Sequence, residues 1–204
     1  ERRKNTTFQL VEDRKLMRVP FDMKIQETKL TRTFYSRPFV PGEEGERARR
    51  CEEILTIQAM GLKKRLAHTH AKSAVVGISG GLDSTLALLV TAKAFDALGM
   101  DRSGITAVTM PCFGTTDRTY QNACKMSKKL GATLKEVPIA ASVEQHFKDI
   151  GHDPEDHSVT YENSQARERT QVLMDIANAA GGMVIGTGDM SELALGWATY
   201  NGCL

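Results

Sequence analysis

The chain has few cysteines, and none of them are spaced as a pair. The four cysteines stand singly at positions 51, 112, 124 and 203, without a C-x-x-C motif. Scattered thiols are typical of a reducing compartment rather than of a disulfide framework or a zinc site. We therefore expect a cytoplasmic protein with reduced cysteines. His68 and His70 form an H-x-H pair, but neither cysteines nor an acidic cluster accompany them, so solvated surface is a better interpretation than a metal site.

Long hydrophobic runs and a strong charge of one sign are also missing. No apolar stretch approaches the roughly 20 residues that cross a bilayer, and no apolar segment of a signal peptide follows the basic N-terminus. The formal net charge of +2 is too small to indicate nucleic-acid binding by bulk attraction. We therefore expect neither a membrane nor a nucleic acid as a partner. With 41% hydrophobic and 25% charged residues, the composition is that of a soluble globular protein.

The first part of the chain differs from the remainder. Residues 1–34 mix charges with short alternating segments, which indicates extended structure. Residues 35–46 carry prolines and glycines at a density that breaks helices and strands, so they are predicted to be a connector. Residues 47–204 form the third part. A helix is predicted at its start, over 46–68, because apolar residues recur there at helical spacing.

Strands and helices alternate after residue 73. Strands are predicted over 74–78, 105–110, 133–138 and 183–185, the first of them an apolar run. Helical segments are predicted from residue 86 and over 118–130, 143–150 and 163–180. Repeated β–α spacing indicates an α/β fold, with a doubly wound parallel sheet covered by helices on both faces.

A glycine loop, Ser79–Ser84 (Ser-Gly-Gly-Leu-Asp-Ser), separates the first strand from its helix. Strand, glycine loop and helix in this order present backbone N–H groups and a helix N-terminus to phosphate. Asp83 would repel phosphate unless a divalent cation lay between them, so the loop predicts Mg²⁺ together with a nucleotide. The loop is not a Walker A motif, because no Gly-Lys-Ser/Thr follows. The alternative is an ordinary connection in which Ser and Asp only cap the helix.

Ligands of such sheets bind beyond the carboxyl ends of the strands. The segment 109–117 follows the second strand and is rich in small donors. After the last strand, Gly186 and Gly188 flank the Thr187 hydroxyl, and Glu192 adds a carboxylate. If the first and last strands are neighbours, Asp83 and Glu192 meet across one crevice as Mg²⁺ ligands. The alternative for Glu192 is a first-turn acid favoured by the helix dipole.

Three further residues suit a polar anionic ligand that carries a heteroaromatic ring. Asn163 and Arg167 lie four apart, on one side of the predicted helix, and Trp197 could stack on a ring. A solvated helix face and core packing are the respective alternatives. The polar segment 148–162 is predicted to be a mobile cover for the crevice.

The glycine loop resembles the pyrophosphate-binding loop of the N-type ATP pyrophosphatases. The segments 38–41, 50–54, 163–167 and 186–197 are similar to the synthetase domain of glutamine-dependent NAD⁺ synthetases, and the last of these motifs is highly specific. The resemblance covers about residues 38–202. It implies an adenine nucleotide alpha hydrolase-like fold and a carbon–nitrogen ligase that forms homo-oligomers. In such enzymes ATP adenylates deamido-NAD⁺, and ammonia then displaces AMP to give NAD⁺.

By resemblance, each site residue receives a role. ATP would be held by Ser79, Gly80, Gly81, Leu82, Asp83, Ser84, Thr109 and Thr187. Deamido-NAD⁺ would be held by Asn163, Arg167, Glu192 and Trp197, and Mg²⁺ by Asp83 and Glu192. No nucleophilic side chain is needed, because catalysis would rest on positioning and on neutralising the leaving pyrophosphate.

The chain departs from this family in two ways. Ammonia-dependent relatives have an arginine where this chain has Thr109, so one phosphate contact must come from elsewhere. The chain also ends at Leu204, before the C-terminal segments of the family, and residues 1–34 resemble the tail of the amide-hydrolase domain that would supply ammonia. We therefore expect a fragment with reduced or no activity by itself. The alternatives are another ATP pyrophosphatase-type ligase or a non-catalytic nucleotide-binding module.

Overall fold

The computed structural model describes residues 17–27, 29, 31–113 and 117–196. The chain divides into two compact units, residues 1–40 and residues 41–204. In the first unit, the described residues form neither helix nor strand, and all their side chains are exposed. The second unit contains all helices and strands of the described residues. Whether residues 35–46 act as a connector between domains stays a prediction.

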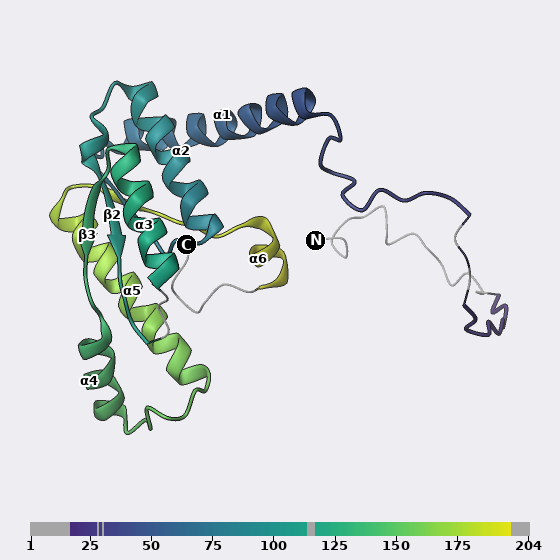
Figure 1. Cartoon of the computed structure of the whole chain (residues 1–204). Helices are drawn as coiled ribbons and strands as arrows, with labels where there is room; N and C mark the ends of the chain where they lie inside the picture. Colours follow the sequence, from purple (N-terminus) through teal and green to yellow (C-terminus); the bar gives the residue numbers. More distant parts are fainter. Residues whose placement is uncertain (1–16, 28, 30, 114–116, 197–204) are drawn as a thin grey trace, which may run out of the picture. The chain divides into compact units, whose positions relative to one another are not determined.

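Four parallel strands form a single sheet in the second unit (Figure 1). They are β1 (Ala74–Gly77), β2 (Ile105–Thr109), β3 (Thr133–Glu136) and β4 (Met183–Ile185). Their order is β3-β2-β1-β4, and Ala74 of β1 pairs with Ile105 on one side and Met183 on the other. The chain thus runs outward from β1 to β3 and returns to add β4 beside β1. The predicted doubly wound parallel sheet is confirmed.

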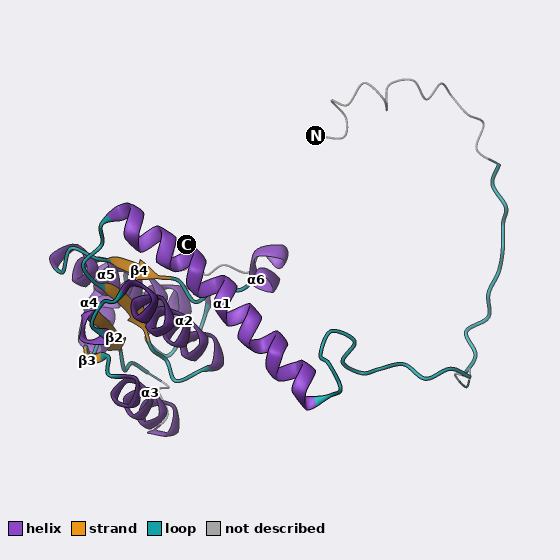
Figure 2. Ribbon diagram, turned by 90° about the horizontal axis from the view of Figure 1, so that it is seen from above, coloured by secondary structure: helices purple, strands orange, loops and turns teal. Residues whose placement is uncertain are grey.

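Helices cover both faces of the sheet (Figures 1 and 2). One face packs against α1 (Glu44–Thr69), α2 (Leu82–Leu98) and α3 (Asp117–Leu130). The other face packs against α4 (Ala140–Ile150) and α5 (Val159–Ala179). Two short helices complete the unit, η3 (Arg102–Gly104) and α6 (Met190–Leu195). None of the described helices is both long enough and apolar enough to cross a membrane.

The central strand β1 supplies side chains to both hydrophobic cores. Ala74 and Val76 belong to the core under α1, α2 and α3, whereas Val75 belongs to the core under α4 and α5. This division follows from the strand period of two, which sends successive side chains to opposite faces. Phe95 and Phe147 are the largest fully buried side chains, one in each core. A strand that is buried on both faces is continuously apolar, as the sequence of β1 is.

Several helices begin earlier than the sequence pattern predicted. α2 begins at Leu82, inside the glycine loop, rather than near residue 86. α4 begins at Ala140 and α5 at Val159, three and four residues before their predicted starts. The polar connection between α4 and α5 is consequently residues 151–158, which is shorter than the predicted segment 148–162.

Candidate nucleotide site

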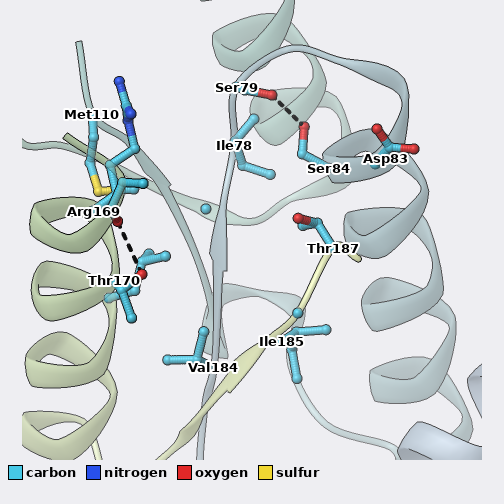
Figure 3. Close-up of a pocket in the computed structure, with 14 residues that line it drawn as sticks. Ile78, Ser79, Asp83, Ser84, Met110, Arg169, Thr170, Val184, Ile185 and Thr187 are labelled. Carbon is cyan, nitrogen blue, oxygen red and sulfur yellow. Dashed lines mark hydrogen bonds between the residues drawn. The ribbon is translucent and has the colours of Figure 1, made fainter. Parts of the chain in front are cut away.

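A cavity of about 280 Å³ opens at the carboxyl ends of β1 and β4 (Figure 3). The loops after these strands form one side of it, and α5 forms the other. Its lining residues are Gly77, Ile78, Ser79, Asp83, Ser84, Met110, Ala166, Arg169, Thr170, Leu173, Val184, Ile185, Gly186 and Thr187. The predicted ATP residues Ser79, Asp83, Ser84 and Thr187 are therefore brought together. This is the position expected for ligands of a doubly wound sheet, because the strand order reverses between β1 and β4.

The glycine loop is held in shape by its own polar groups. The hydroxyls of Ser79 and Ser84 lie 3.2 Å apart, and the Gly81 N–H donates to the Ser79 Oγ over 3.2 Å. Thr85 Oγ1 donates to the Gly81 carbonyl over 2.7 Å. No side chain caps α2, whose N-cap is Gly81. The alternative in which Ser and Asp cap this helix is therefore wrong, and the first-turn N–H groups are open to an anion.

Gly80 lets the loop pass close to the first turn of α3. Its φ is +83°, and a Cβ atom at this position would lie 2.1 Å from the Thr119 carbonyl oxygen. Tyr120, the next residue of α3, donates its hydroxyl to Glu136 at the end of β3 over 2.5 Å. This hydrogen bond raises the pKa of Tyr120 to about 12. The start of α3 is thereby tied to the sheet at the point where the loop approaches it.

The two predicted metal ligands occupy different surroundings. Asp83 lies in the first turn of α2 and lines the cavity. Glu192 does not line it, although both residues follow the carboxyl ends of adjacent strands. Instead, Glu192 closes a capping box at α6: its carboxylate accepts from the Asp189 N–H over 3.0 Å, and its own N–H donates to the Asp189 carboxylate over 2.7 Å. The described residues contain no cluster of three or more His, Cys, Asp or Glu side chains suited to a metal.

The wall formed by α5 consists of other residues than those predicted. Asn163 and Arg167 do not line the cavity, and Arg167 is exposed. Their place is taken by Arg169 and Thr170, together with Ala166 and Leu173. These four recur at spacings of three and four, so they share one face of α5. That spacing was visible in the sequence, but a mixture of small, charged and apolar residues did not distinguish a cavity wall from an ordinary helix face.

Three other predictions concern residues outside the cavity wall. Thr109 is 4% exposed at the end of β2, and its neighbour Met110 lines the cavity in its place. None of the residues 151–158 line the cavity. In that connection, His157 stacks on Tyr161 with ring centroids 4.4 Å apart. Its ring therefore packs against α5, the helix that follows the connection. Trp197 lies outside the described residues.

Arg169 of α5 places a positive charge at the cavity wall. Burial raises the pKa of the Cys112 thiol, and a hydrogen bond with the Phe113 backbone and then the positive charge of Arg169 partly offset this effect. Arg169 therefore lies close enough to the segment after β2 to influence its titration. At neutral pH the thiol is protonated, and the guanidinium of Arg169 brings a positive charge to this side of the cavity.

Comparisons with known proteins show the family of this chain. A family model described as NAD synthase matches residues 54–204. The chain belongs to the NAD synthase family. Among curated members of this family, the glutamine-dependent NAD⁺ synthetase of Mycobacterium leprae is 46% identical over 167 residues. The Mycobacterium tuberculosis enzyme is 44% identical over the same length. The resemblance to the synthetase domain of these enzymes is confirmed.

The chain spans about a quarter of the length of these NAD synthase relatives, since the match covers 80% of the chain and 25% of each relative. Among solved structures, glutamine-dependent NAD⁺ synthetase from Acinetobacter baumannii in complex with ADP aligns with a TM-score of 0.68 and 28% identity. That alignment covers 74% of this chain and 28% of the other. NH₃-dependent NAD synthetase from Campylobacter jejuni aligns with a TM-score of 0.64 and 24% identity over 74% and 62% of the two chains, which shows a shared fold.

Proposed function

We propose that this chain is part of a carbon–nitrogen ligase that converts deamido-NAD⁺ to NAD⁺ at the expense of ATP. The nicotinate carboxylate attacks the α-phosphate of ATP, and pyrophosphate leaves. Ammonia then attacks the adenylated carboxyl carbon, AMP leaves, and the carboxamide of NAD⁺ remains. The observation that carries the proposal is the glycine loop with an uncapped helix N-terminus, opening on a cavity in a member of the NAD synthase family.

The proposed ATP site uses backbone donors and hydroxyls. Residues Ser79–Ser84 offer N–H groups at the start of α2, and Ser79 and Ser84 keep their hydroxyls at the cavity. Thr187 adds a hydroxyl from the segment after β4. Such donors suit a pyrophosphate leaving group, because they stabilise negative charge without any rearrangement during the reaction. The ADP in the structure of the Acinetobacter baumannii relative supports the proposal that this chain binds a nucleotide.

Asp83 and Glu192 are proposed to hold Mg²⁺. The donor set of the cavity fits this ion, since the Asp83 carboxylate stands beside hydroxyl oxygens and lacks a cationic partner among the described ion pairs. Mg²⁺ prefers one or two carboxylates together with phosphate oxygens and water. When bound, it would neutralise charge on the departing pyrophosphate. The second carboxylate oxygen of Glu192 is not used in its capping box.

The remaining roles are proposals from the family resemblance. Asn163, Arg167, Glu192 and Trp197 would contact deamido-NAD⁺. A glutamine-hydrolysing domain of the same enzyme would supply the ammonia, as the names of the mycobacterial relatives indicate for those proteins. We further propose that the whole enzyme is a cytoplasmic homo-oligomer.

Isothermal titration calorimetry with each substrate tests the proposal. The chain is titrated with ATP and Mg²⁺, and in a second experiment with deamido-NAD⁺. Binding of both ligands is expected. Binding of ATP alone would favour a different ATP pyrophosphatase-type ligase, and binding of neither would favour an inert fragment.

A further inference from the structure

The glycine loop rests directly against the first turn of α3, which lies next to α2 on the same face of the sheet (Figure 1). Gly80 follows Ser79, which lines the cavity, and precedes Gly81, the N-cap of α2. A Cβ atom at Gly80 would lie 2.1, 2.8 and 3.0 Å from the carbonyl oxygen, carbonyl carbon and Cα of Thr119. The two backbones are therefore in contact, and a displacement of the first turn of α3 would free the loop to move.

Tyr120 fastens this turn of α3 to the sheet. Its hydroxyl donates to Glu136 Oε2 over 2.5 Å, which is typical of a short hydroxyl–carboxylate hydrogen bond. The pKa of Tyr120 is raised to about 12, first by this hydrogen bond and then by one with Cys124, so the hydroxyl keeps its proton at neutral pH. Cys124 lies one turn further along α3 itself. Of these two partners, only Glu136 links the helix to another element.

Glu136 in turn is fixed by the sheet. It is the last residue of β3 and pairs with Thr109 of β2, and the N–H of the next residue, Val137, donates to the Thr109 carbonyl over 2.9 Å. On the other side of β2, the Ile78 N–H donates to the Val108 carbonyl over 2.8 Å, directly before the glycine loop. The contacts thus form a closed ring that runs from the loop through α3, β3 and β2 back to β1.

We propose that Tyr120 is a positioning residue for the phosphates of the nucleotide, because it holds the first turn of α3 against the glycine loop. The inference rests on the proposed function. Donors that are aligned before the ligand arrives bind it without a cost of ordering, and hydrogen bonds behind the site maintain that alignment. Tyr120 does not line the cavity, so its effect passes through Thr119 and Gly80. Neither Tyr120 nor Glu136 was assigned a role from the sequence, because they lie on different elements.

The test compares variants that break this hydrogen bond with one that keeps it. Tyr120→Phe removes the donor, Glu136→Ala removes the acceptor, and Glu136→Gln removes the charge but keeps an accepting oxygen. Tyr35→Phe, at an exposed tyrosine of the first unit, is the matched control. Dissociation constants for ATP and for inorganic tripolyphosphate, both with Mg²⁺, are measured by calorimetry.

Tyr120→Phe is expected to weaken ATP and tripolyphosphate alike, by about fivefold, which is the effect of one hydrogen bond. Both ligands lose equally, because the loop holds the phosphates that they share. Glu136→Ala should do the same, and the double variant should show no further loss, since both substitutions remove one contact. Glu136→Gln and Tyr35→Phe should stay within about twofold of the unaltered chain, because the hydrogen bond remains.

Glu136→Ala also separates positioning from electrostatics. Removal of a carboxylate near an anion site would by itself strengthen phosphate binding, whereas loss of the hydrogen bond to Tyr120 should weaken it. Glu136→Gln removes the same charge and keeps the hydrogen bond, so the two variants should differ.

Amide hydrogen exchange, followed by NMR without ligand, measures the loop itself. The Gly81 N–H, which donates to Ser79 Oγ, should exchange about fivefold faster in Tyr120→Phe and should keep its rate in Glu136→Gln. A merely structural role of Tyr120 would lower the free energy of unfolding, which urea unfolding measures. It would not change the affinity of the folded chain for phosphates.

Four results would overturn the positioning role while leaving the proposed function intact. They are unchanged affinities in Tyr120→Phe, a loss for ATP that tripolyphosphate does not share, equal losses in Glu136→Gln and Glu136→Ala, and an unchanged exchange rate of Gly81 in Tyr120→Phe. An unaltered chain that binds neither ATP nor tripolyphosphate would instead overturn the proposed function, and the positioning role with it.

Discussion

Gly80 and Gly99 both have positive φ, but their surroundings differ. Gly80 has φ +83° and no room for a Cβ atom, whereas Gly99 has φ +69° at the end of α2 and nothing within 4 Å. Alanine at Gly99 would bring only the strain of the left-handed conformation, about 1–2 kcal/mol. Alanine at Gly80 would add a collision with the backbone of Thr119.

We therefore expect Gly80→Ala to lower the free energy of unfolding clearly more than Gly99→Ala, which should cost about 1–2 kcal/mol. Urea unfolding of the two variants measures the difference. Gly80→Ala should also weaken ATP binding, because the loop must move away from α3. Equal destabilisation by both substitutions would mean that the loop is not confined by Thr119.

Asp83→Asn tests the proposed metal ligand without changing the size of the side chain. Mg²⁺-dependent ATP binding should weaken at least tenfold, which corresponds to about 1.4 kcal/mol, because an amide oxygen is a poorer ligand for Mg²⁺ than a carboxylate. Calorimetry with and without Mg²⁺ measures the effect. Asp175→Asn, on the exposed side of α5, is the control that should leave the affinity unaltered. An unchanged affinity in Asp83→Asn would refute the metal role.

The residues of the site differed in how well they could be predicted. Ser79, Asp83, Ser84 and Thr187 were found because the carboxyl ends of parallel strands meet at one edge of the sheet. The cavity face of α5 was missed, since the sequence does not tell how a half-buried helix is rotated against its sheet. The capping partner of Glu192 could have been predicted from the sequence, because Asp189 stands three residues before Glu192, which is the spacing of a capping box.

At the scale of elements, α6 depends on its reciprocal cap. The helix has six residues, Met190–Leu195, and none of its side chains are buried. Tertiary packing therefore contributes little, and the hydrogen bonds between Asp189 and Glu192 orient the segment. The proposed metal ligand Glu192 is thus held in place by the device that begins its helix.

Asp189→Ala removes this cap and should cost about 1 kcal/mol of local stability. The amide hydrogen of Glu192, which donates to the Asp189 carboxylate, should then exchange with solvent about fivefold faster. Hydrogen exchange followed by NMR measures this rate. Glu192→Gln keeps an acceptor for the Asp189 N–H and should leave the exchange nearly unchanged. Equal protection in Asp189→Ala would show that the box does not stabilise α6.

The elements of the sheet were predictable because their pattern is local. β1, β2 and β4 are short apolar runs next to polar turns, whereas the edge strand β3 is exposed, and the bounds of all four strands were predicted to within about two residues. The starts of α2, α4 and α5 were less accurate, because their first turns do not show the apolar spacing of a helix. In α2 this ambiguity has a functional origin, since its first turn is also part of the glycine loop.

At the scale of the whole chain, none of the described residues of the first unit belong to either hydrophobic core of the second. Residues 17–40 have exposed side chains wherever they are described, and all described core residues lie within residues 41–204. A chain that begins at Pro41 should therefore unfold within about 1 kcal/mol of the full chain, because exposed residues rarely affect stability. Urea unfolding of both chains measures this. A larger loss would mean that residues 1–40 stabilise the fold.

Ligand binding should be visible in the thermal stability of either chain, because a ligand that binds only the native state adds to the free energy of unfolding. At a concentration one hundred times its dissociation constant, ATP with Mg²⁺ should add about 2.7 kcal/mol. For a protein of this size, such a gain raises Tm by about 5–11 °C. Differential scanning fluorimetry measures the shift. Chelating Mg²⁺ should remove most of it from the unaltered chain, whereas Asp83→Asn should show only a small shift with or without chelator. A shift that survives chelation in the unaltered chain would mean that the nucleotide binds through the loop and the α5 wall without a metal.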